Sequence, residues 1–562
     1  MTGATALVAA LAAHGVDTVF GIPGTHNLPI YQALVEAGIR CVTTRHEQGA
    51  GYAADGYARV TGRTGVVVTT TGPGVLNAAT ALAQAYSDSS PVLLISPGVP
   101  LAHPRQGRGW LHETKDQSRA LDAVCAWSHR VTSTAEIPAA VARAFTRASA
   151  AGDCRPRPVH LEIPADLLDA PTGPLKAPSD GPMGGPMGGP VDGPVDGSMG
   201  GPMGGPIDGA FGGRPIAVPA RTPHRPALEA AARRLRAARR PGIVLGGGSR
   251  EAGEPALALA ERLGAYVVTT ANGKATIPES HPLSLGATLH LRAVQEWLVS
   301  CDVVLAVGTE LAPSDLWVDD FRLTGTLIRV DLDPGQMYGD HVADVALVAD
   351  AALTLTALAE LVDGAGQTAP GDEGHVRTRR DEELVGLMDR WQEPLRAIRA
   401  ALPTDAIVTA DSSMFCYYGA LGGLPVDPPG RFLYPTGYGT LGFALPAAIG
   451  AKVARPATPV AALTGDGALQ FTLQELATAV EVGLPLPVVV CVNDGYGEIR
   501  AEMLDRGMPP VAVDLHTPDF VRVAEGFGAR GTFVETFADM RTAVEDALRA
   551  PVPTVIVFRE RP

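Results

Sequence analysis

The stretch PVAALTGDGALQFTLQELATAVEVGLPLPVVVCVNDGYGEIR, residues 459–500, decides the fold. Its pattern predicts a buried strand over residues 460–463, a tight turn at 465–467, a helix over about 472–482 and a second apolar strand over 487–492. This is a βαβ unit, in which two parallel strands deliver the turns that follow them to the same edge of the sheet. We therefore expect Asp466 and Asn493 to lie side by side, although they are far apart in the sequence.

The turns after these two strands offer a set of oxygen ligands. Asp466 supplies a carboxylate, Asn493 an amide oxygen and Gly495 a backbone carbonyl. Such a hard oxygen site suits Mg²⁺, which keeps positions open for phosphate oxygens. A Gly-Asp-Gly turn alone is usually only a strand-to-helix connection, but the Asn-Asp-Gly after the next strand favours the binding site.

Gly-Asp-Gly followed by Asn at this interval resembles the diphosphate-and-magnesium signature of enzymes that depend on thiamine diphosphate (ThDP). The resemblance extends over almost the whole chain and is to the superfamily of acetolactate synthases and 2-oxo acid decarboxylases. It implies that ThDP and Mg²⁺ bind at this turn. The residues that it places at the cofactor are Gly465, Asp466, Gly467, Ala468, Asn493, Gly495 and Tyr496, of which Asp466, Asn493 and Gly495 would bind the metal.

Composition limits the class of protein. A chain of 562 residues is too long for one core, and its 46% apolar and 19% charged residues are ordinary for a globular protein. The net charge of −15 argues against a nucleic acid or an anionic membrane as the main partner. No apolar run predicts a transmembrane helix, and six cysteines without CxxC spacing indicate reduced thiols in a cytoplasmic protein.

Alternating helix and strand patterns predict an α/β fold with three doubly wound, Rossmann-like domains and parallel sheets. The resemblance implies a pyrimidine-binding domain over residues 1–170, a central domain over 225–365 and a diphosphate-binding domain over 378–562. Residues 171–224 are rich in Gly, Pro and Met and lack a periodic apolar face. We expect them to form a flexible linker without a catalytic role, because such a segment cannot bury enough surface to fold.

Glu47 is the main catalytic candidate in the first domain. It stands where a strand passes into a helix rich in Ala and Gly, a place where a glutamate often serves only the helix dipole. The resemblance implies that the Glu47 carboxyl group hydrogen-bonds to ring nitrogen N1′ of ThDP and so activates the thiazolium C2. It also implies that Pro73 and Asn77 stand near the pyrimidine ring, and that Thr25 and His26 line the pocket for the substrate carboxylate.

The stretch GRGWLHETKDQ, residues 107–117, predicts a charged loop over the site. Acetohydroxyacid synthases carry Phe-Gln-Glu at about this point, whereas the aligned residues here are Leu111, His112 and Glu113. His112 therefore replaces a glutamine, and its imidazole can transfer protons near neutral pH. This departure weakens a simple assignment as an acetolactate synthase.

Two segments of the third domain complete the predicted cofactor site. A strand over 406–410 leads to Ser413, which by the resemblance contacts the diphosphate. The segment TGYGTLGFALPAAIGAKVA, residues 436–454, resembles the family's segment beneath the two cofactor rings. It implies that the carbonyl of Gly439 accepts a hydrogen bond from the exocyclic amine and that Leu441 lies between the rings.

The middle domain carries Gly246-Gly247-Gly248-Ser249 after a predicted strand. Such a turn offers a cradle for a pyrophosphate, but the GxGxxG fingerprint is missing. FAD, which the corresponding domain of acetohydroxyacid synthases holds, is therefore an alternative. We prefer a structural domain without FAD.

The runs LHETKDQ and NDGYGEIR together look most like 5-guanidino-2-oxopentanoate decarboxylases. Their acidic residues Glu113, Asp116 and Glu498 are candidate partners for a guanidinium, because a carboxylate pairs with it through two hydrogen bonds. We predict a ThDP- and Mg²⁺-dependent, non-oxidative decarboxylation of a 2-oxo acid to an aldehyde, with 5-guanidino-2-oxopentanoate and 4-guanidinobutanal as the best candidates. The alternative is a carboligase resembling acetolactate synthase, which joins an enamine from pyruvate to a second 2-oxo acid or aldehyde.

The resemblance also implies an assembly. Glu47 and Asp466 lie on different domains, which in the family meet across a subunit boundary, so we expect a homodimer or homotetramer. An oxidase or an acyl-phosphate-forming relative is a further alternative. A non-catalytic regulatory subunit is disfavoured because Glu47, Asp466 and Asn493 are all present. The substrate side chain and the fate of the enamine stay open.

Overall fold

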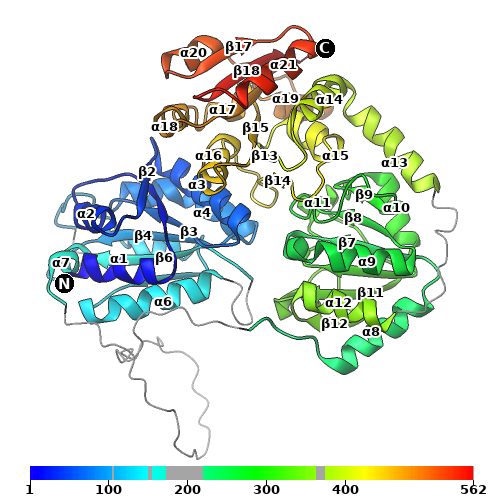
Figure 1. Ribbon diagram of the computed structural model, residues 1–562, viewed down its shortest axis with the longest axis horizontal. Helices are drawn as coiled ribbons and strands as arrows, with labels where there is room; N and C mark the ends of the chain where they lie inside the picture. The colour runs from blue at the N-terminus through cyan, green and yellow to red at the C-terminus, as the bar shows by residue number, and fades with distance from the viewer. Residues whose placement is uncertain (104–106, 150–154, 173–218, 363–373, 561–562) are drawn as a thin grey trace, which may run out of the picture.

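The computed structural model consists of three α/β units grouped around the centre of the molecule (Figure 1). The N-terminal domain is blue and cyan, the middle domain is green, and the C-terminal domain lies above both in yellow to red. The structure describes residues 1–103, 107–149, 155–172, 219–362 and 374–560, so that most of the predicted linker lies outside the described residues. No helix in the described ranges is long and apolar enough to cross a membrane.

Each domain contains one six-stranded sheet, and all neighbouring strands in the three sheets are parallel. The first sheet has the order β2-β1-β3-β4-β6-β5 and consists of β1 (Thr18–Gly21), β2 (Arg40–Thr43), β3 (Gly65–Val68), β4 (Val92–Gly98), β5 (Trp127–Arg130) and β6 (Val159–Pro164). The second has the order β12-β11-β10-β7-β8-β9 and consists of β7 (Pro241–Leu245), β8 (Tyr266–Thr269), β9 (Ser284–Gly286), β10 (Val303–Val307), β11 (Thr326–Asp331) and β12 (Val345–Val348). The third has the order β14-β13-β15-β16-β18-β17 and consists of β13 (Ile407–Ala410), β14 (Arg431–Leu433), β15 (Val460–Gly465), β16 (Pro487–Val492), β17 (Arg530–Phe533) and β18 (Thr554–Arg559).

Helices cover both faces of the sheets, which confirms the predicted fold of three doubly wound α/β domains. The N-terminal domain has α1 (Gly3–Ala13), α2 (Leu28–Glu36), α3 (Glu47–Thr61), α4 (Pro73–Ser87), α5 (Gln117–Leu121), η1 (Thr134–Glu136), α6 (Ile137–Ala148) and α7 (Ala165–Asp169). The middle domain has α8 (Arg225–Ala237), η2 (Gly247–Ala252), α9 (Gly253–Leu263), α10 (Arg292–Ser300), α11 (Pro313–Leu316), η3 (Pro334–Tyr338) and α12 (Ala351–Leu361). The C-terminal domain has α13 (Gly374–Leu387), η4 (Asp389–Trp391), α14 (Gln392–Ala401), the π-helix η5 (Phe415–Ala420), α15 (Leu421–Gly423), α16 (Ala444–Ala454), α17 (Asp466–Leu469), α18 (Glu475–Val482), α19 (Gly497–Asp505), α20 (Phe520–Gly526) and α21 (Phe537–Ala547).

The strand orders show where ligands are expected. The first and third sheets share one topology, in which the order reverses between β1 and β3 and between β13 and β15. The second sheet has the Rossmann order and reverses between β7 and β10. Ligands of open α/β sheets bind outside the carboxyl ends of the strands at such a reversal. Residues 22–27 and 69–77 follow the first pair of strands, and residues 411–413 and 466–468 follow the second.

Helices α3 and α16 join the N-terminal and C-terminal domains, and they lie side by side at the centre of Figure 1. Small residues allow their backbones to approach. A Cβ atom on Gly56 would lie 2.2 Å from the carbonyl oxygen of Ala447, and one on Gly450 would lie 1.8 Å from that of Ala53. Because no side chain fits in either place, both positions require glycine, and the two helices form one continuous apolar core.

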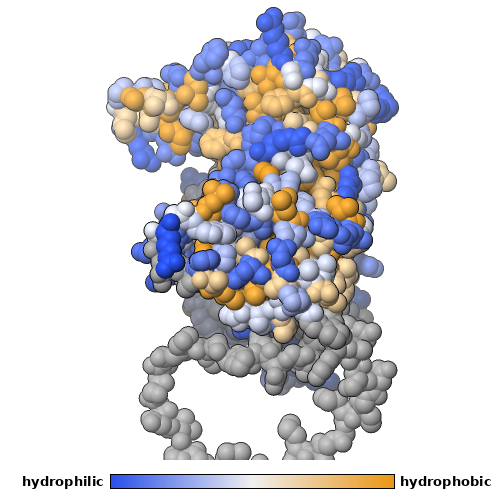
Figure 2. Space-filling model, turned by 90° about the vertical axis from the view of Figure 1, so that its left-hand side faces the viewer, coloured by the Kyte–Doolittle hydropathy of each residue, from blue (hydrophilic) through white to orange (hydrophobic). Residues whose placement is uncertain are grey.

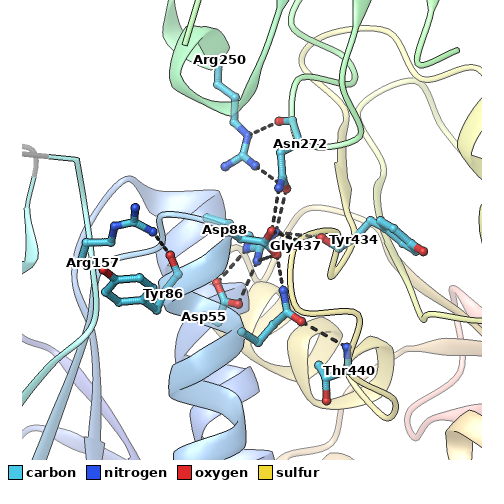
Figure 3. A network of polar contacts seen from close by, with 11 residues as sticks. Asp55, Tyr86, Asp88, Arg157, Arg250, Asn272, Tyr434, Gly437 and Thr440 are labelled. Atoms are coloured by element: carbon cyan, nitrogen blue, oxygen red, sulfur yellow. Dashed lines mark hydrogen bonds and ion pairs between the residues drawn. The ribbon is translucent and has the colours of Figure 1, made fainter. Parts of the chain in front are cut away.

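A buried polar network around Arg59 ties the three domains together. Figure 3 shows its members Asp55, Asp88, Asn272 and Tyr434. The Arg59 guanidinium donates to both carboxylate oxygens of Asp55, at 2.7 and 3.0 Å, and to Oδ2 of Asp88 at 2.7 Å. It also donates to Asn272 of the middle domain at 3.0 Å and to the carbonyl oxygen of Tyr434 in the C-terminal domain at 3.1 Å. Burial opposes the charge of Arg59, but Asp55 and Asp88 raise its pKa above the usual value. One cation thereby contacts all three domains.

The structure also departs from the predicted elements. The helix predicted over about 472–482 is α18, which starts at Glu475, whereas the turn predicted at 465–467 leads directly into a further short helix, α17. The strands β5, β9, β12, β14, β17 and β18 were not predicted. All of them except β18 are edge strands of three to four residues, and such short strands leave only a weak apolar pattern. The five cysteines in the described ranges are free, as expected: Cys41, Cys125, Cys301, Cys416 and Cys491.

Candidate active site

Glu47 lies at the carboxyl edge of the first sheet. It is the first residue of α3, and it is 8% exposed. Asn77, on α4, donates from Nδ2 to Oε2 of Glu47 at 3.0 Å. Pro73 begins α4, and a Cβ atom on the next residue, Gly74, would lie 3.1 Å from Oε1 of Glu47. The structure therefore brings together the three residues that the sequence assigned to the pyrimidine ring.

An aromatic cluster lies at the same sheet edge. His26 stacks on Trp110, with ring centroids 4.6 Å apart, and its ring meets the ring of His112 edge-on at 5.2 Å. Nδ1 of His26 and Nδ1 of His112 are both buried without a hydrogen-bond partner. Burial and the neighbouring His112 lower the pKa of His26. Thr25, which follows β1 in the same turn, is exposed.

More polar atoms at this edge lack partners. The hydroxyl oxygens of Thr69, Thr70 and Thr71 are buried without a hydrogen bond, immediately before the turn that leads into α4. Buried polar groups in proteins are normally satisfied. Unpartnered donors and acceptors on three neighbouring loops are therefore the signature of a site that is completed by a ligand.

The predicted substrate carboxylates Glu113 and Asp116 are used in local structure. Glu113 accepts hydrogen bonds from the backbone N–H groups of Gly107, Gly109 and Trp110, at 3.0, 3.1 and 3.2 Å. Asp116 caps α5 by accepting from the N–H of Arg119 at 3.1 Å. Both carboxylates thus shape the loop that carries His112.

Asp466 lies at the carboxyl edge of the third sheet, as Glu47 lies at the carboxyl edge of the first. Asp466 is 2% exposed, and its Oδ1 accepts from the N–H of Gly467 at 2.9 Å. Its Oδ2 accepts from the N–H of Asp494 at 2.9 Å, which links the turn after β15 to the turn after β16. Burial raises the pKa of Asp466. A nearby cation would lower this pKa again by favouring the ionised carboxylate.

Asn493 lies beside Asp466, as the βαβ unit predicted. The amide oxygen of Asn493 is 3.2 Å from Oδ1 of Asp466 and 3.1 Å from the carbonyl oxygen of Gly495, whereas its nitrogen faces the sulfur of Met414 at 4.0 Å. Three acceptor oxygens therefore converge without a hydrogen between them. Either the amide turns over, so that its nitrogen donates to both oxygens, or a cation lies between the three.

The spacing of these oxygens fits a magnesium ion. In an octahedral site with Mg–O distances of about 2.1 Å, neighbouring oxygens are about 3.0 Å apart. No group of three or more His, Cys, Asp or Glu side chains surrounds a metal position within the described residues. A site with a single carboxylate suits an ion that takes its remaining ligands from phosphate and water.

Ser413 and the glycine-rich turns adjoin this oxygen site. Oγ of Ser413 is buried without a partner, and a Cβ atom on Gly465 would lie 3.0 Å from Cβ of Ser413. The ring of Tyr496 similarly crowds Gly467, where a Cβ atom would lie 3.2 Å from it. Gly467 and Ala468 form the first turn of α17, whose N-terminus suits an anion. The donor set fits a diphosphate held by a cation.

The segment that carries Gly439 and Leu441 is anchored by neighbours that the sequence analysis missed. Gly439 is exposed and Leu441 is half-buried, so both are accessible to a ligand. Asp411 accepts from the backbone N–H groups of Gly442, Phe443 and Ala444, at 2.9, 3.4 and 3.3 Å. Burial raises the pKa of Asp411 to about 6, although these N–H groups lower it. Asp411 directly follows β13 at the same sheet edge as Asp466, and this position in the sequence could have marked it as a site residue.

Two further positioning residues, Gln117 and Glu475, were also missed. Gln117 accepts from the N–H of Gly72 at 2.8 Å and so ties the His112 loop to α4. Glu475, on α18, accepts from the N–H groups of Arg45 and His46, at 3.1 and 3.0 Å. Burial raises the pKa of Glu475. It connects the C-terminal domain to the residues before Glu47, although no sequence pattern links the two segments.

Glu498 belongs to a second aromatic cluster. It lies in the first turn of α19, and its Oε1 accepts from the hydroxyl of Tyr418 at 2.8 Å. The rings of Tyr417 and Tyr418 meet Trp317 of the middle domain edge-on, at 6.1 and 5.4 Å. Trp317 in turn stacks on His290 at 4.0 Å. This cluster adjoins the oxygen site, since Glu498 follows Gly495 by three residues.

The glycine turn of the middle domain packs against another turn. The N–H groups of Gly246 and Gly248 donate to the carbonyl oxygens of Val307 and Gly308, at 2.9 and 3.0 Å. A Cβ atom on Gly246 would lie 2.2 Å from the carbonyl oxygen of Gly308. This close approach by itself accounts for the glycines in the turn, so a bound nucleotide is not needed to explain them.

Comparison with known proteins matches all three domains to one family. Residues 1–120 match "Thiamine pyrophosphate enzyme, N-terminal TPP binding domain", residues 228–358 match the central domain, and residues 415–558 match the C-terminal TPP binding domain. The chain is 42% identical over 532 residues to the "Probable 2-ketoarginine decarboxylase AruI" of Pseudomonas aeruginosa, covering 94% of this chain and 88% of that protein.

Acetolactate synthases are also similar. The "Probable acetolactate synthase large subunit" of Methanocaldococcus jannaschii is 31% identical over 579 residues, covering 99% of this chain and 91% of that protein. The "Acetolactate synthase isozyme 2 large subunit" of Escherichia coli is 32% identical over 581 residues, covering 99% and 95%.

Proposed function

The chain belongs to the thiamine pyrophosphate enzyme family, and on this premise we propose that it decarboxylates a 2-oxo acid to an aldehyde with the help of ThDP and Mg²⁺. The observation that carries the proposal is the convergence of oxygens from Asp466, Asn493 and Gly495 beside the unpartnered hydroxyl of Ser413. A carboligase resembling acetolactate synthase is the second candidate, favoured by the similarity to acetolactate synthase large subunits.

The residues of the third sheet edge would hold the cofactor. Asp466, Asn493 and the carbonyl of Gly495 would bind Mg²⁺, while Ser413 and the first turn of α17 would bind the diphosphate. Gly439 and Leu441 would contact the rings from the accessible segment that Asp411 anchors. Bound ThDP supplies an electron sink for the pair released as CO₂ leaves.

Glu47 would act at the opposite end of the cofactor. Asn77 occupies its Oε2, so Oε1 is the oxygen free to share a proton with a ring nitrogen. Burial of the carboxyl group and the hydrogen bond from Asn77 hold this group in place. His26 and His112, with their unpartnered nitrogens, would bind the substrate carboxylate or transfer a proton to the product.

We also propose that the site is completed by a second copy of the chain. Glu47 is hydrogen-bonded by Asn77 of its own N-terminal domain, whereas Asp466 is hydrogen-bonded by Gly467 and Asp494 of its own C-terminal domain. Figure 2 shows orange hydrophobic areas on the face that includes the N-terminal domain. Several large hydrophobic residues next to site residues are exposed: Leu76, Leu111, Tyr438 and Phe471. Their burial against a second copy would favour a homodimer or homotetramer.

For the substrate, we propose 5-guanidino-2-oxopentanoate, the transaminated form of arginine, with 4-guanidinobutanal as the product. The similarity to a probable 2-ketoarginine decarboxylase supports this choice. So does the half-buried carboxylate of Glu498, which accepts a hydrogen bond from Tyr418 but has no cationic partner among the described residues.

A panel of 2-oxo acids tests the proposed function. The purified protein, with ThDP and Mg²⁺, is supplied with 5-guanidino-2-oxopentanoate, 2-oxohexanoate or pyruvate, and CO₂ and the organic product are measured. We expect CO₂ and 4-guanidinobutanal in equal amounts, with the highest kcat/KM for the guanidino acid. Acetolactate from pyruvate alone would instead establish the carboligase, and turnover that requires oxygen or phosphate would contradict both.

Replacing Asp466 by asparagine tests the metal site. Asp466→Asn keeps an oxygen but removes the charge, so we expect the Mg²⁺ concentration for half-maximal activity to rise by at least about tenfold, as for lost metal-site interactions generally. The matched control is Asp494→Asn, because Asp494 is the exposed neighbour and pairs with Arg559 instead. Its backbone is left-handed, with φ of 63°, a conformation that asparagine adopts readily. Equal responses of both variants to Mg²⁺ would contradict the assignment.

A further inference from the structure

A cavity between the middle and C-terminal domains is not used by the site described so far. The centres of water-sized spheres can occupy about 40 Å³ of it, and its wall includes Thr269, His290, Asp315, Trp317, Tyr434 and Thr436. We call it the interdomain cavity. Its wall comes from residues after β8 and β9, from α11 and its C-cap, and from the segment after β14.

Three polar atoms of the cavity residues lack a hydrogen-bond partner. They are Nε2 of His290 and the hydroxyl oxygens of Thr269 and Thr436, all of them buried. Burial lowers the pKa of His290 to about 3, so its ring is neutral and one nitrogen can accept a hydrogen bond. Because buried polar atoms are normally satisfied, these three indicate an occupant with several N–H or O–H donors.

Asp315 is an acidic group in the wall of the cavity. It accepts one hydrogen bond, from the N–H of Ala271 at 3.2 Å, and forms no ion pair within the described residues. Two other carboxylates with buried side chains have cationic partners, since Asp88 pairs with Arg59 and Glu279 pairs with Lys274. Burial raises the pKa of Asp315 to about 7, as expected for a carboxylate that lacks a countercharge.

Trp317 supplies a flat wall in an unusual backbone conformation. Its φ is 58°, in the left-handed region that residues other than glycine rarely adopt, and its side chain is 39% exposed. Such backbone outliers cluster at ligand-binding positions. The Trp317 ring also meets the rings of Tyr417 and Tyr418, which follow Ser413 in the chain by four and five residues.

We propose that the interdomain cavity binds the cationic end of the substrate, with Asp315 pairing with a guanidinium that stacks on Trp317. A guanidinium is planar, carries five N–H donors and stacks on aromatic rings. The cavity offers the matching acceptors: a carboxylate, an imidazole nitrogen and two hydroxyl oxygens. Thr436 lies three residues before Gly439, so the cavity adjoins the segment that carries Gly439 and Leu441, toward which the 2-oxo acid end of the same molecule would extend. The assignment rests on the proposed decarboxylase function and specifies its substrate pocket.

The test compares Asp315→Asn with Asp319→Asn in the complete enzyme. Both variants lose one negative charge, but Asp319 is exposed in the loop after α11. For Asp315→Asn we expect KM for 5-guanidino-2-oxopentanoate to rise about 10- to 100-fold, the usual effect of losing a hydrogen bond to a charged group. We expect kcat to change little, and KM for 2-oxohexanoate, whose side chain is uncharged, to stay within about twofold of the wild-type value. Asp319→Asn should match the wild type with both substrates.

Binding of 5-guanidinopentanoate, which lacks the 2-oxo group, supplies a readout without catalysis. By calorimetry we expect it to bind the wild type with ThDP and Mg²⁺ more tightly than pentanoate does, and Asp315→Asn to abolish this preference. Affinity should rise between pH 6 and 8, as the Asp315 carboxyl loses its proton. The facing groups His290 and Tyr434 stay neutral in this range, because burial lowers the pKa of the first and raises that of the second. Asp88 and Glu310 are the other charges that act on Asp315.

The outcomes separate this inference from the proposed function. If the wild type decarboxylates the guanidino acid and Asp315→Asn keeps its KM, the cavity holds only water and the assignment is wrong. An equal rise of KM for both substrates would also overturn it, because it would indicate distorted folding. If the wild type turns over other 2-oxo acids but neither uses the guanidino acid nor binds the analogue, the proposed substrate and the pocket are both wrong. If Asp315→Asn does not fold, Trp317→Leu replaces it and should weaken analogue binding selectively.

Discussion

Glu47→Gln is expected to lower kcat by about 10² to 10⁴-fold, the usual contribution of a positioned acid-base group, while ThDP still binds. Asn77 already donates to Oε2, so Oε1 must hold or release the proton shared with the cofactor. A glutamine has the same shape but cannot exchange a proton at that atom. The measurement is the steady-state rate with the preferred 2-oxo acid, together with a fluorescence titration with ThDP in the presence of Mg²⁺.

Glu36→Gln is the matched control for this prediction. Glu36 ends α2 in the same domain, is exposed and hydrogen-bonds to Gln32 at 3.0 Å. We expect this variant to keep the wild-type rate and the wild-type affinity for ThDP. If Glu47→Gln also kept its rate, the proposed role of Glu47 would be wrong. If it lost ThDP binding instead, Glu47 would serve binding rather than proton transfer.

Arg59→Met is expected to destabilise the folded protein by about 3 to 5 kcal/mol, as for other buried ion pairs from which one partner is removed. The side chains of Arg59, Asp55 and Asp88 are at most 2% exposed, so methionine leaves two buried carboxylates without their countercharge. It also removes the hydrogen bonds to Asn272 and to the carbonyl oxygen of Tyr434, which hold the other two domains. The measurement is the midpoint of denaturant-induced unfolding, followed by circular dichroism.

Arg63→Met makes the same substitution four residues later. Arg63 pairs with Asp17 in an exposed ion pair, with side chains 44% and 58% exposed. Exposed pairs contribute about 0 to 1 kcal/mol, so this variant should unfold close to the wild type. Arg59→Lys, which keeps the charge but loses the paired hydrogen bonds to Asp55, should lie between the two. Equal stability of Arg59→Met and Arg63→Met would show that the network does not join the domains.

Much of the fold could be predicted from the sequence. The two buried strands around Asp466 have continuous apolar runs, and a parallel βαβ unit can close only in a way that brings their following turns together. The juxtaposition of Asp466 and Asn493 is therefore confirmed, at 3.2 Å between their oxygens. Glu47 was identified from a motif at the start of a helix, and it begins α3 as expected. The roles of these residues in cofactor binding stay predictions.

Edge strands and charged loops were harder to interpret. An edge strand such as β17 is only partly buried, so its sequence lacks the apolar run that marks the central strands. The sequence analysis predicts Glu113 and Asp116 as substrate carboxylates, because the sequence alone does not reveal which groups an acidic loop residue contacts. The structure uses both to hold backbone N–H groups, a role that depends on how the loop folds back on itself.

The sequence by itself determined the three parallel sheets and the polar turns at their carboxyl edges, because strand burial and turn geometry are local properties that leave a periodic pattern. Only the tertiary structure decided how the domains meet. Arg59 reaches Asn272 and Tyr434, and Asp315 shares a cavity with Thr436, across more than one domain. Such contacts depend on the packing of whole domains, and a single charged residue in a sequence does not reveal which distant group will face it.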